Sequence, residues 1–193
     1  MRLKSVPRFH RQRGASLIEV LVSIVLASVG LLALAGMSAT ANRYSKMSQY
    51  RATATLLAND YAERMRVNRA GFTAGAYDYT QDFLAQSATP TLPTEQCNAS
   101  SAALCNAADL AAVDQVQWRL IVRSQLPLGS VFARRQTTEN AMDLWVSWVD
   151  PAVAATDEQP KAVNECPTDL NIGDLGTDAL REGVRCVYFR VNL

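Results

Sequence analysis

Side chains with the types and spacing that catalysis needs are few in this chain of 193 residues. Its one histidine, His10, lies among basic residues near the start, and no glycine-rich phosphate loop or serine-centred elbow occurs. Pairs of carboxylates stay open as acid–base groups, because spacing alone does not show which of them meet in the fold. We therefore expect a protein that is not an enzyme and has no cofactor.

The four cysteines all lie in the C-terminal half, at Cys97, Cys105, Cys166 and Cys186. They allow three disulfide pairings, and the sequence alone does not choose among them. We favour the two bridges between cysteines adjacent in the sequence, Cys97–Cys105 and Cys166–Cys186. No C-x-x-C motif is present and His10 lies far away, so a zinc site is disfavoured and no metal is expected.

The turn-rich, acidic segment 150–182 offers oxygen atoms that could bind calcium. The candidate ligands are Asp169, Asn171, Asp174 and Asp178. The segment does not fit the EF-hand template, because the glycine is displaced and Leu180 stands where a glutamate is needed. We expect a solvated acidic loop there.

One carboxylate, Glu19, interrupts a long apolar segment. Residues 15–39 carry no other charge, and Gly14 lies five residues before Glu19. As a helix these 25 residues would be about 37 Å long, enough to cross a hydrocarbon core of about 30 Å. A charge inside a membrane is unfavourable by about 2.5–3.5 kcal/mol at mid-depth, less near an end, so Glu19 should have a function.

Charge is distributed unevenly on either side of this segment. Residues 1–14 hold five of the 19 basic residues and no acid, which leaves 14 basic against 18 acidic residues, a net charge of −4. By the positive-inside rule the basic leader stays cytoplasmic and the rest is exported. The acidic remainder gives no electrostatic reason to bind nucleic acid.

Two simpler interpretations of the N-terminus remain open. The segment could be a plain signal anchor, or a secretory signal cut after the A-x-A site Ala33-Leu34-Ala35. Against the second, the apolar stretch exceeds the usual 7–15 residues or so, and a secretory signal has no use for Glu19.

A helical pattern continues beyond the apolar segment. One stripe repeats at intervals of three and four residues and contains Met47, Tyr50, Ala54, Leu57, Tyr61 and Met65. We expect the helix to end near Arg69, with Gly71 as its C′ residue.

Beyond this helix we expect an irregular connection over residues 72–114 and then strands. Alternating apolar residues predict four strands, at 116–123, 130–135 (the weakest), 143–149 and 184–191. The tryptophans at 118, 145 and 148 are expected in packing rather than in a ligand cage. An α+β fold follows, with a small antiparallel sheet on the helix.

The residues Gly14-Ala-Ser-Leu-Ile-Glu19-Val resemble the N-terminus of type IV prepilins, although Ala15 stands where that family commonly has phenylalanine. The resemblance implies that prepilin peptidase cuts between Gly14 and Ala15 and N-methylates Ala15. It also implies that Glu19 serves subunit assembly. Physically, its carboxylate can neutralise the new amine of Ala15 in its own chain or in a neighbour.

The segment 60–68 resembles a helix end of PilV-type minor pilins and of minor pseudopilins of type II secretion. We expect Arg64, Arg66 and Arg69 there to complement the helix dipole rather than bind phosphate. The resemblance implies a pilin-like α+β fold with a disulfide-bounded C-terminal loop. Its parts are a removed leader at 1–14, a transmembrane or filament-core helix at 15–39, an amphipathic helix at 40–70 and a globular head at 71–193.

By this resemblance the chain is a minor pilin that primes pilus assembly near the filament tip and supports adhesion and twitching motility. The implied partners are prepilin peptidase, other minor pilins, the major pilin, the inner-membrane assembly platform and a tip adhesin. The chain would span the bacterial inner membrane once with its head in the periplasm, and then enter a surface pilus. The alternatives are a minor pseudopilin of type II secretion, a tip module that binds DNA, a surface or an adhesin, and an anchored or secreted domain without a filament role.

Overall fold

The computed structural model describes residues 16–94, 97, 105–151, 166–172 and 183–193. The chain forms two compact units, Met1–Tyr44 and Ser45–Leu193. We call the first the N-terminal unit and the second the head. Among the described residues, the first contains the beginning of a long helix, and the second contains the rest of that helix together with two further α-helices and three strands.

Helix α1 spans Leu17–Val67 without interruption, so the prediction of one long N-terminal helix is confirmed. Within the head, the predicted stripe lies against the core, where Ala54, Tyr61 and Met65 are fully buried. Residues on the opposite side, such as Glu63, are exposed. Burial of one helical face is thus what holds this half of α1 in place.

The end of α1 differs from the prediction at Gly71. Asn68 ends α1 and caps the short helix α2 (Arg69–Thr73), because its side-chain oxygen accepts a hydrogen bond from the Gly71 N–H. Gly71 therefore lies inside a helix rather than just beyond one. A Cβ at this position would lie 2.7 Å from the Ala107 carbonyl oxygen. Close approach of the two segments, and not a left-handed backbone, explains the glycine.

The strand predicted at residues 116–123 is wrong, because these residues belong to helix α3 (Ala107–Gln125). Asn106 and Asp109 form a capping box that starts this helix. Trp118 and Val122, four residues apart, are both fully buried. The short 3₁₀ helix η1 (Leu84–Ser87) and the first turns of α3 interrupt the irregular connection expected over residues 72–114.

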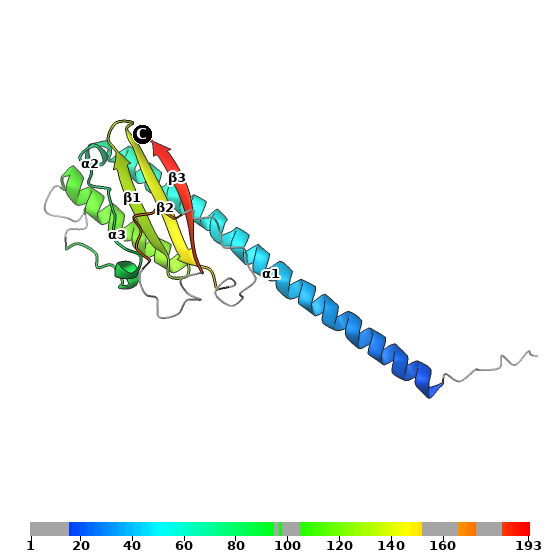
Figure 1. Ribbon diagram of the computed structural model, residues 1–193. Helices are drawn as coiled ribbons and strands as arrows, with labels where there is room; N and C mark the ends of the chain where they lie inside the picture. The colour runs from blue at the N-terminus through cyan, green and yellow to red at the C-terminus, as the bar shows by residue number, and fades with distance from the viewer. Residues whose placement is uncertain (1–15, 95–96, 98–104, 152–165, 173–182) are drawn as a thin grey trace, which may run out of the picture. The chain divides into compact units, whose positions relative to one another are not determined.

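In the part of the chain that the structure describes, the sheet has three antiparallel strands in the order β1-β2-β3, rather than the four expected. The strands are β1 (Ser130–Gln136), β2 (Ala141–Val149) and β3 (Val184–Asn192). They contain the three remaining predicted strands, including the weakest one. Figure 1 shows α3 and the head portion of α1 on one side of this sheet.

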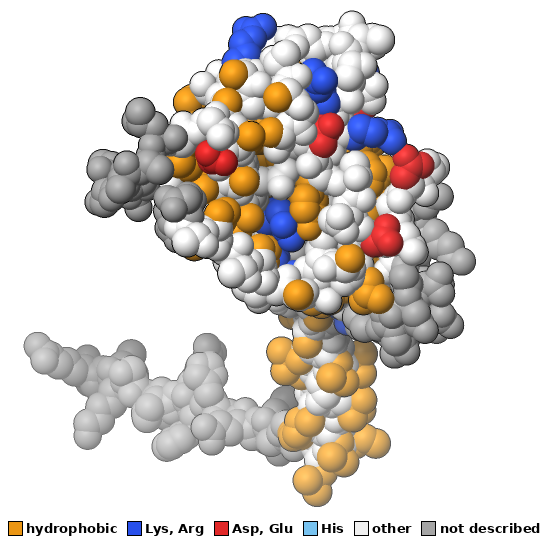
Figure 2. Space-filling view, turned by 90° about the vertical axis from the view of Figure 1, so that its left-hand side faces the viewer, with side chains coloured by type: hydrophobic (Ala, Val, Ile, Leu, Met, Phe, Trp, Pro, Cys, Tyr) orange, Lys and Arg blue, Asp and Glu red, His pale blue; other side chains and the backbone are white. Residues whose placement is uncertain are grey.

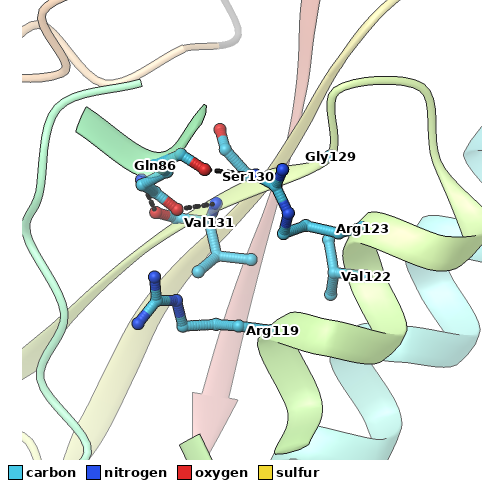
Figure 3. Close-up of a pocket in the computed structure, with 7 residues that line it drawn as sticks. All are labelled: Gln86, Arg119, Val122, Arg123, Gly129, Ser130 and Val131. Carbon is cyan, nitrogen blue, oxygen red and sulfur yellow. Dashed lines mark hydrogen bonds between the residues drawn. The ribbon is translucent and has the colours of Figure 1, made fainter. Parts of the chain in front are cut away.

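The outer edge of β1 is closed by the segment that follows α2. Tyr79 and Ala133 exchange two backbone hydrogen bonds of 2.8 and 2.7 Å. The Gln86 side chain accepts a hydrogen bond from the Val131 N–H at 3.0 Å and donates one to the Val131 carbonyl at 2.8 Å. Figure 3 shows this amide facing β1, with Arg123 reaching toward it from α3. A side chain thus takes the place of a fourth strand along this edge.

The two faces of the sheet bury different clusters. On the inner face Leu144 and Val146 join α1 and α3 in the main core. The opposite face, which we call the outer face, carries a smaller cluster that includes Phe132, Leu170 and Cys186. The alternation of side chains along each strand produces this division.

Candidate functional site

The N-terminal unit presents an apolar helix whose described residues are all exposed. Leu17 is 84% exposed and Leu32 is 74% exposed. Hydrophobic side chains cover the visible side of this part of α1 in Figure 2. A window of 18 residues has a mean hydropathy of 2.6, so α1 is long and apolar enough to cross a membrane. A helix that is apolar on every side is normally buried in a membrane or among other helices.

Glu19 lies exposed in the first turn of this helix. Its N–H donates a hydrogen bond to the Ser16 carbonyl at 3.0 Å. The first N–H groups of a helix carry partial positive charge, which favours a carboxylate at this position. Gly14 and Ala15, the predicted cleavage and methylation positions, lie outside the described residues. Ala15 precedes Glu19 by four residues, about the length of one helical turn.

Polar side chains near Glu19 bond to the helix itself. The Ser23 hydroxyl donates to the Glu19 carbonyl and the Ser28 hydroxyl to the Ile24 carbonyl, both at 2.7 Å. Such bonds let hydroxyl groups lie in an apolar environment. Glu19 is left as the one charged side chain over residues 16–42, all of which the structure describes.

In the head, α1 is held to α3 by stacked aromatic rings and a chain of hydrogen bonds. The Tyr61 and Trp118 rings lie 4.0 Å apart between centroids, and the Trp118 indole donates to the Leu57 carbonyl at 2.8 Å. The Tyr61 hydroxyl donates to the Tyr77 carbonyl at 2.7 Å, and the Tyr77 hydroxyl to Asp114 at 2.6 Å. Burial raises the pKa of both tyrosines well above the usual value, so both stay protonated donors.

The arginines at the end of α1 have carboxylate partners. Arg64 forms ion pairs with Asp60 at 3.2 Å and with Asp114 of α3 at 3.1 Å. Arg66 pairs with Glu63 one turn earlier. Arg64 therefore links the two helices, a contact that sequence spacing did not reveal because Asp114 is fifty residues away.

A row of aromatic rings crosses the outer face of the sheet, one from each strand. Trp145 of β2 lies between Phe132 of β1 and Tyr188 of β3, with centroid distances of 5.8 and 4.9 Å. Next to this row Asp143 accepts hydrogen bonds from the Tyr188 hydroxyl at 2.7 Å and from Gln136 at 2.6 Å. Burial, and to a smaller extent the hydrogen bond to Asp143, raises the pKa of Tyr188 to about 12.

A hollow of about 520 Å³ lies over this row and is bounded on one side by residues 166–168. Arg134 lines it and donates a hydrogen bond of 2.6 Å to Asp169. That bond is the main reason why the pKa of Asp169 lies below its usual range. This hollow was not predicted from the sequence, although the alternation of side chains along β2 and β3 places its aromatic residues on one face.

Two family models match the chain. A model described as type IV pilin Tt1218-like matches residues 33–116, and the prokaryotic N-terminal methylation motif matches residues 9–35. The resemblance to type IV pilins is confirmed. No curated protein and no solved structure matches the chain. Residues 117–193 lie outside both family matches.

The methylation motif covers Gly14, Ala15 and Glu19, the residues on which the resemblance was based. It implies processing by prepilin peptidase and assembly with other pilins. Together with the apolar part of α1 it fits a pilin anchored in a membrane. Pilins are structural subunits rather than enzymes.

Two disulfides lie in the head, and they are the pairings favoured from the sequence. Cys97 bonds to Cys105 across a separation of eight residues, and Cys166 bonds to Cys186 across twenty. The second bridge ties residues 166–172 to β3, beside the outer-face hollow.

Of the four candidate calcium ligands, the structure describes Asp169 and Asn171. Asp169 is bonded to Arg134, and Asp174 and Asp178 lie outside the described residues. Among the residues that the structure describes, no three metal-ligating side chains form a group.

Proposed function

We propose that this chain is a minor pilin of a type IV pilus that primes filament assembly and occupies a place near the filament tip. The observation that carries the proposal is the exposed apolar half of α1, which has Glu19 as its single charge and begins within the matched methylation motif. In this role the chain supports pilus biogenesis, adhesion and twitching motility.

Processing creates the assembly-competent N-terminus. Prepilin peptidase removes residues 1–14 by cutting between Gly14 and Ala15 and methylates the new amine of Ala15. The apolar helix at 15–39 stays in the mature protein and holds it in the inner membrane until assembly. The amphipathic part at 40–70 packs on the globular part at 71–193, which faces the periplasm.

Glu19 directs docking of the helix into the growing filament. The amine of Ala15 and the carboxylate of Glu19 each carry a full charge in an apolar environment, where an unpaired charge is strongly unfavourable. When the amine of one subunit pairs with the carboxylate of its neighbour, neither charge is left unpaired. The two groups meet at only one axial offset between the two helices. The pair therefore selects the axial register of the incoming subunit, which an apolar helix surface alone specifies poorly.

The partners follow from this role. They are the inner-membrane assembly platform, the other minor pilins, the major pilin and an adhesin at the tip. The two disulfides suit a head that matures in an oxidising compartment such as the periplasm.

Filament and membrane fractions of a strain that carries the gene, a deletion strain and a complemented strain test the proposal. Mass spectrometry should find the mature chain starting at N-methylated Ala15, in sheared filaments at low abundance relative to the major pilin. Deletion should reduce the number of surface filaments and leave type II secretion unchanged. A start at Gly36 or at Met1, or a loss of secretion with normal filaments, would overturn the proposal.

A further inference from the structure

We propose that the hollow on the outer face of the sheet binds a neutral saccharide, which stacks on Trp145 and Tyr188 and bonds to the polar groups around them. This site is distinct from the N-terminal assembly segment, because it lies wholly within the head. It would give the pilin a ligand in addition to its protein partners.

Aromatic side chains supply the platform. Trp145 is half-buried and Tyr188 is 43% exposed, so part of each ring faces outward. Phe132 packs edge-on against Trp145 from the other side, with the ring planes at 77°. This neighbour limits rotation of the Trp145 ring. The faces of aromatic rings carry partial negative charge and attract the C–H groups on the apolar side of a sugar ring.

Hydrogen-bonding groups surround the platform. The Asp143 carboxylate accepts two bonds, from Tyr188 and Gln136, and a carboxylate has about four acceptor sites. No described residue accepts a hydrogen bond from the Trp145 indole. Thr168 and Arg134 also line the hollow, and the side chain of each donates a hydrogen bond to Asp169. Donors and acceptors are thus mixed, which suits sugar hydroxyls because each can both donate and accept.

The charges around the hollow are balanced, which favours a neutral ligand. Asp143 is directly opposite Arg134 on one side and Arg190 on the other in the strand register. Each arginine has its own carboxylate partner, Asp169 for Arg134 and Glu139 for Arg190. An anionic ligand would meet the carboxylates of Asp143 and Asp169, and a cation would meet Arg134. Neither sign is favoured, so a polyhydroxylated neutral molecule fits best.

The size of the hollow agrees with a small ligand. Its volume of about 520 Å³ lies within the range of about 300–1,000 Å³ that is typical of small-molecule sites. The disulfide between Cys166 and Cys186 fixes one wall, since it anchors residues 166–168 to β3. A wall anchored in this way would lose little conformational entropy when a ligand binds.

Tryptophan NMR signals give a direct test, because the three indoles differ in environment. Trp118 bonds to Leu57 and Trp148 is fully buried, whereas Trp145 borders the hollow. The full-length, ¹⁵N-labelled pilin would be titrated with maltose, lactose, cellobiose and N,N′-diacetylchitobiose. The protein would be held in micelles of a zwitterionic detergent, because the sugar headgroups of glycoside detergents would compete with the added sugars for the hollow. At least one sugar should shift the Trp145 indole signal and leave the other two indole signals in place. The Trp145 signal is assigned as the one that is missing from the spectrum of Trp145→Phe.

Matched variants locate the binding. Trp145→Ala should weaken the affinity at least about tenfold, as truncation of a central aromatic contact commonly does. Arg134→Gln should weaken it several-fold, whereas Arg66→Gln, which removes another exposed arginine with a carboxylate partner, should leave it unchanged.

Three results would overturn the proposal. The first is the absence of a Trp145 shift with any of the sugars up to about 10 mM, which would detect a millimolar affinity. The second is equal shifts of all three indoles. The third is binding of a sulfated disaccharide or of tetramethylammonium in preference to the neutral sugars.

Discussion

The ring of Trp118 in α3 lies nearly parallel to that of Tyr61 in α1, with centroids 4.0 Å and planes 16° apart. Both side chains are fully buried, and the Trp118 indole also donates to the Leu57 carbonyl of α1. One residue of α3 therefore supplies both apolar area and a hydrogen bond to the long helix. The Tyr61–Trp118 pair is a principal contact between these two helices of the head.

Replacement of Trp118 should destabilise the head strongly. Trp118→Ala should lower the free energy of unfolding by about 3–5 kcal/mol, since it leaves a large cavity. Trp118→Phe keeps most of the ring but removes the indole donor, and should lower it by about 1–3 kcal/mol. Urea unfolding followed by the fluorescence of the other two tryptophans measures both. Ile121→Ala, at a partly exposed position of α3, should change stability by less than about 1 kcal/mol.

The position of Trp118 also shows where prediction from the sequence failed. Alternating apolar residues at 116–123 indicated a strand, but Trp118 and Val122 are equally consistent with one face of a helix. The deciding signal is the capping box formed by Asn106 and Asp109, which lie ten and seven residues before position 116. Short windows lost this information because the helix starts well before the apolar pattern.

The strands and α1 could be predicted because their signals are local. β2 and β3 alternate along their length, and α1 combines a membrane-length apolar segment with a regular stripe. The outer-face site was not predicted, since Trp145 and Tyr188 are more than forty residues apart and their contact depends on the pairing of β2 with β3. Sequence spacing contains no information on such a register.

Glu19→Ala should leave processing intact but prevent efficient incorporation. An unpaired charge in an apolar environment is unfavourable by about 3–5 kcal/mol, so the amount of this subunit in sheared filaments should fall more than about tenfold. Immunoblots of filament and membrane fractions measure it, with the mature N-terminus checked by mass spectrometry. Glu63→Ala, at an exposed glutamate in the head portion of the same helix, should incorporate normally. Normal filament content of Glu19→Ala would falsify the docking role.

The two disulfides should contribute differently to stability. Removal of the bridge with the separation of twenty residues, by Cys166→Ser with Cys186→Ser, should lower the free energy of unfolding by about 3 kcal/mol. The matched double substitution at Cys97 and Cys105 removes a bridge that closes a shorter loop. It should therefore lower the free energy of unfolding by a smaller amount. Cys186 is also buried in the outer-face cluster, which adds to the difference. Chemical denaturation of both double variants measures the two losses in unfolding free energy. A larger loss for the Cys97–Cys105 variant would contradict this account.

Alkaline pH should weaken the head through Tyr188. Its hydroxyl donates a hydrogen bond to Asp143, and its pKa is raised to about 12 from the usual tyrosine value of 10.0. Because the raised value belongs to the folded state, the folded protein keeps a proton that the unfolded chain releases first. The stabilisation from Tyr188 is therefore complete below about pH 10 and is lost as the pH rises toward 12. Tyr188→Phe should have a shallower fall in unfolding free energy between these pH values, measured by urea titration at each pH. An unchanged slope in the variant would mean that Tyr188 does not couple to folding.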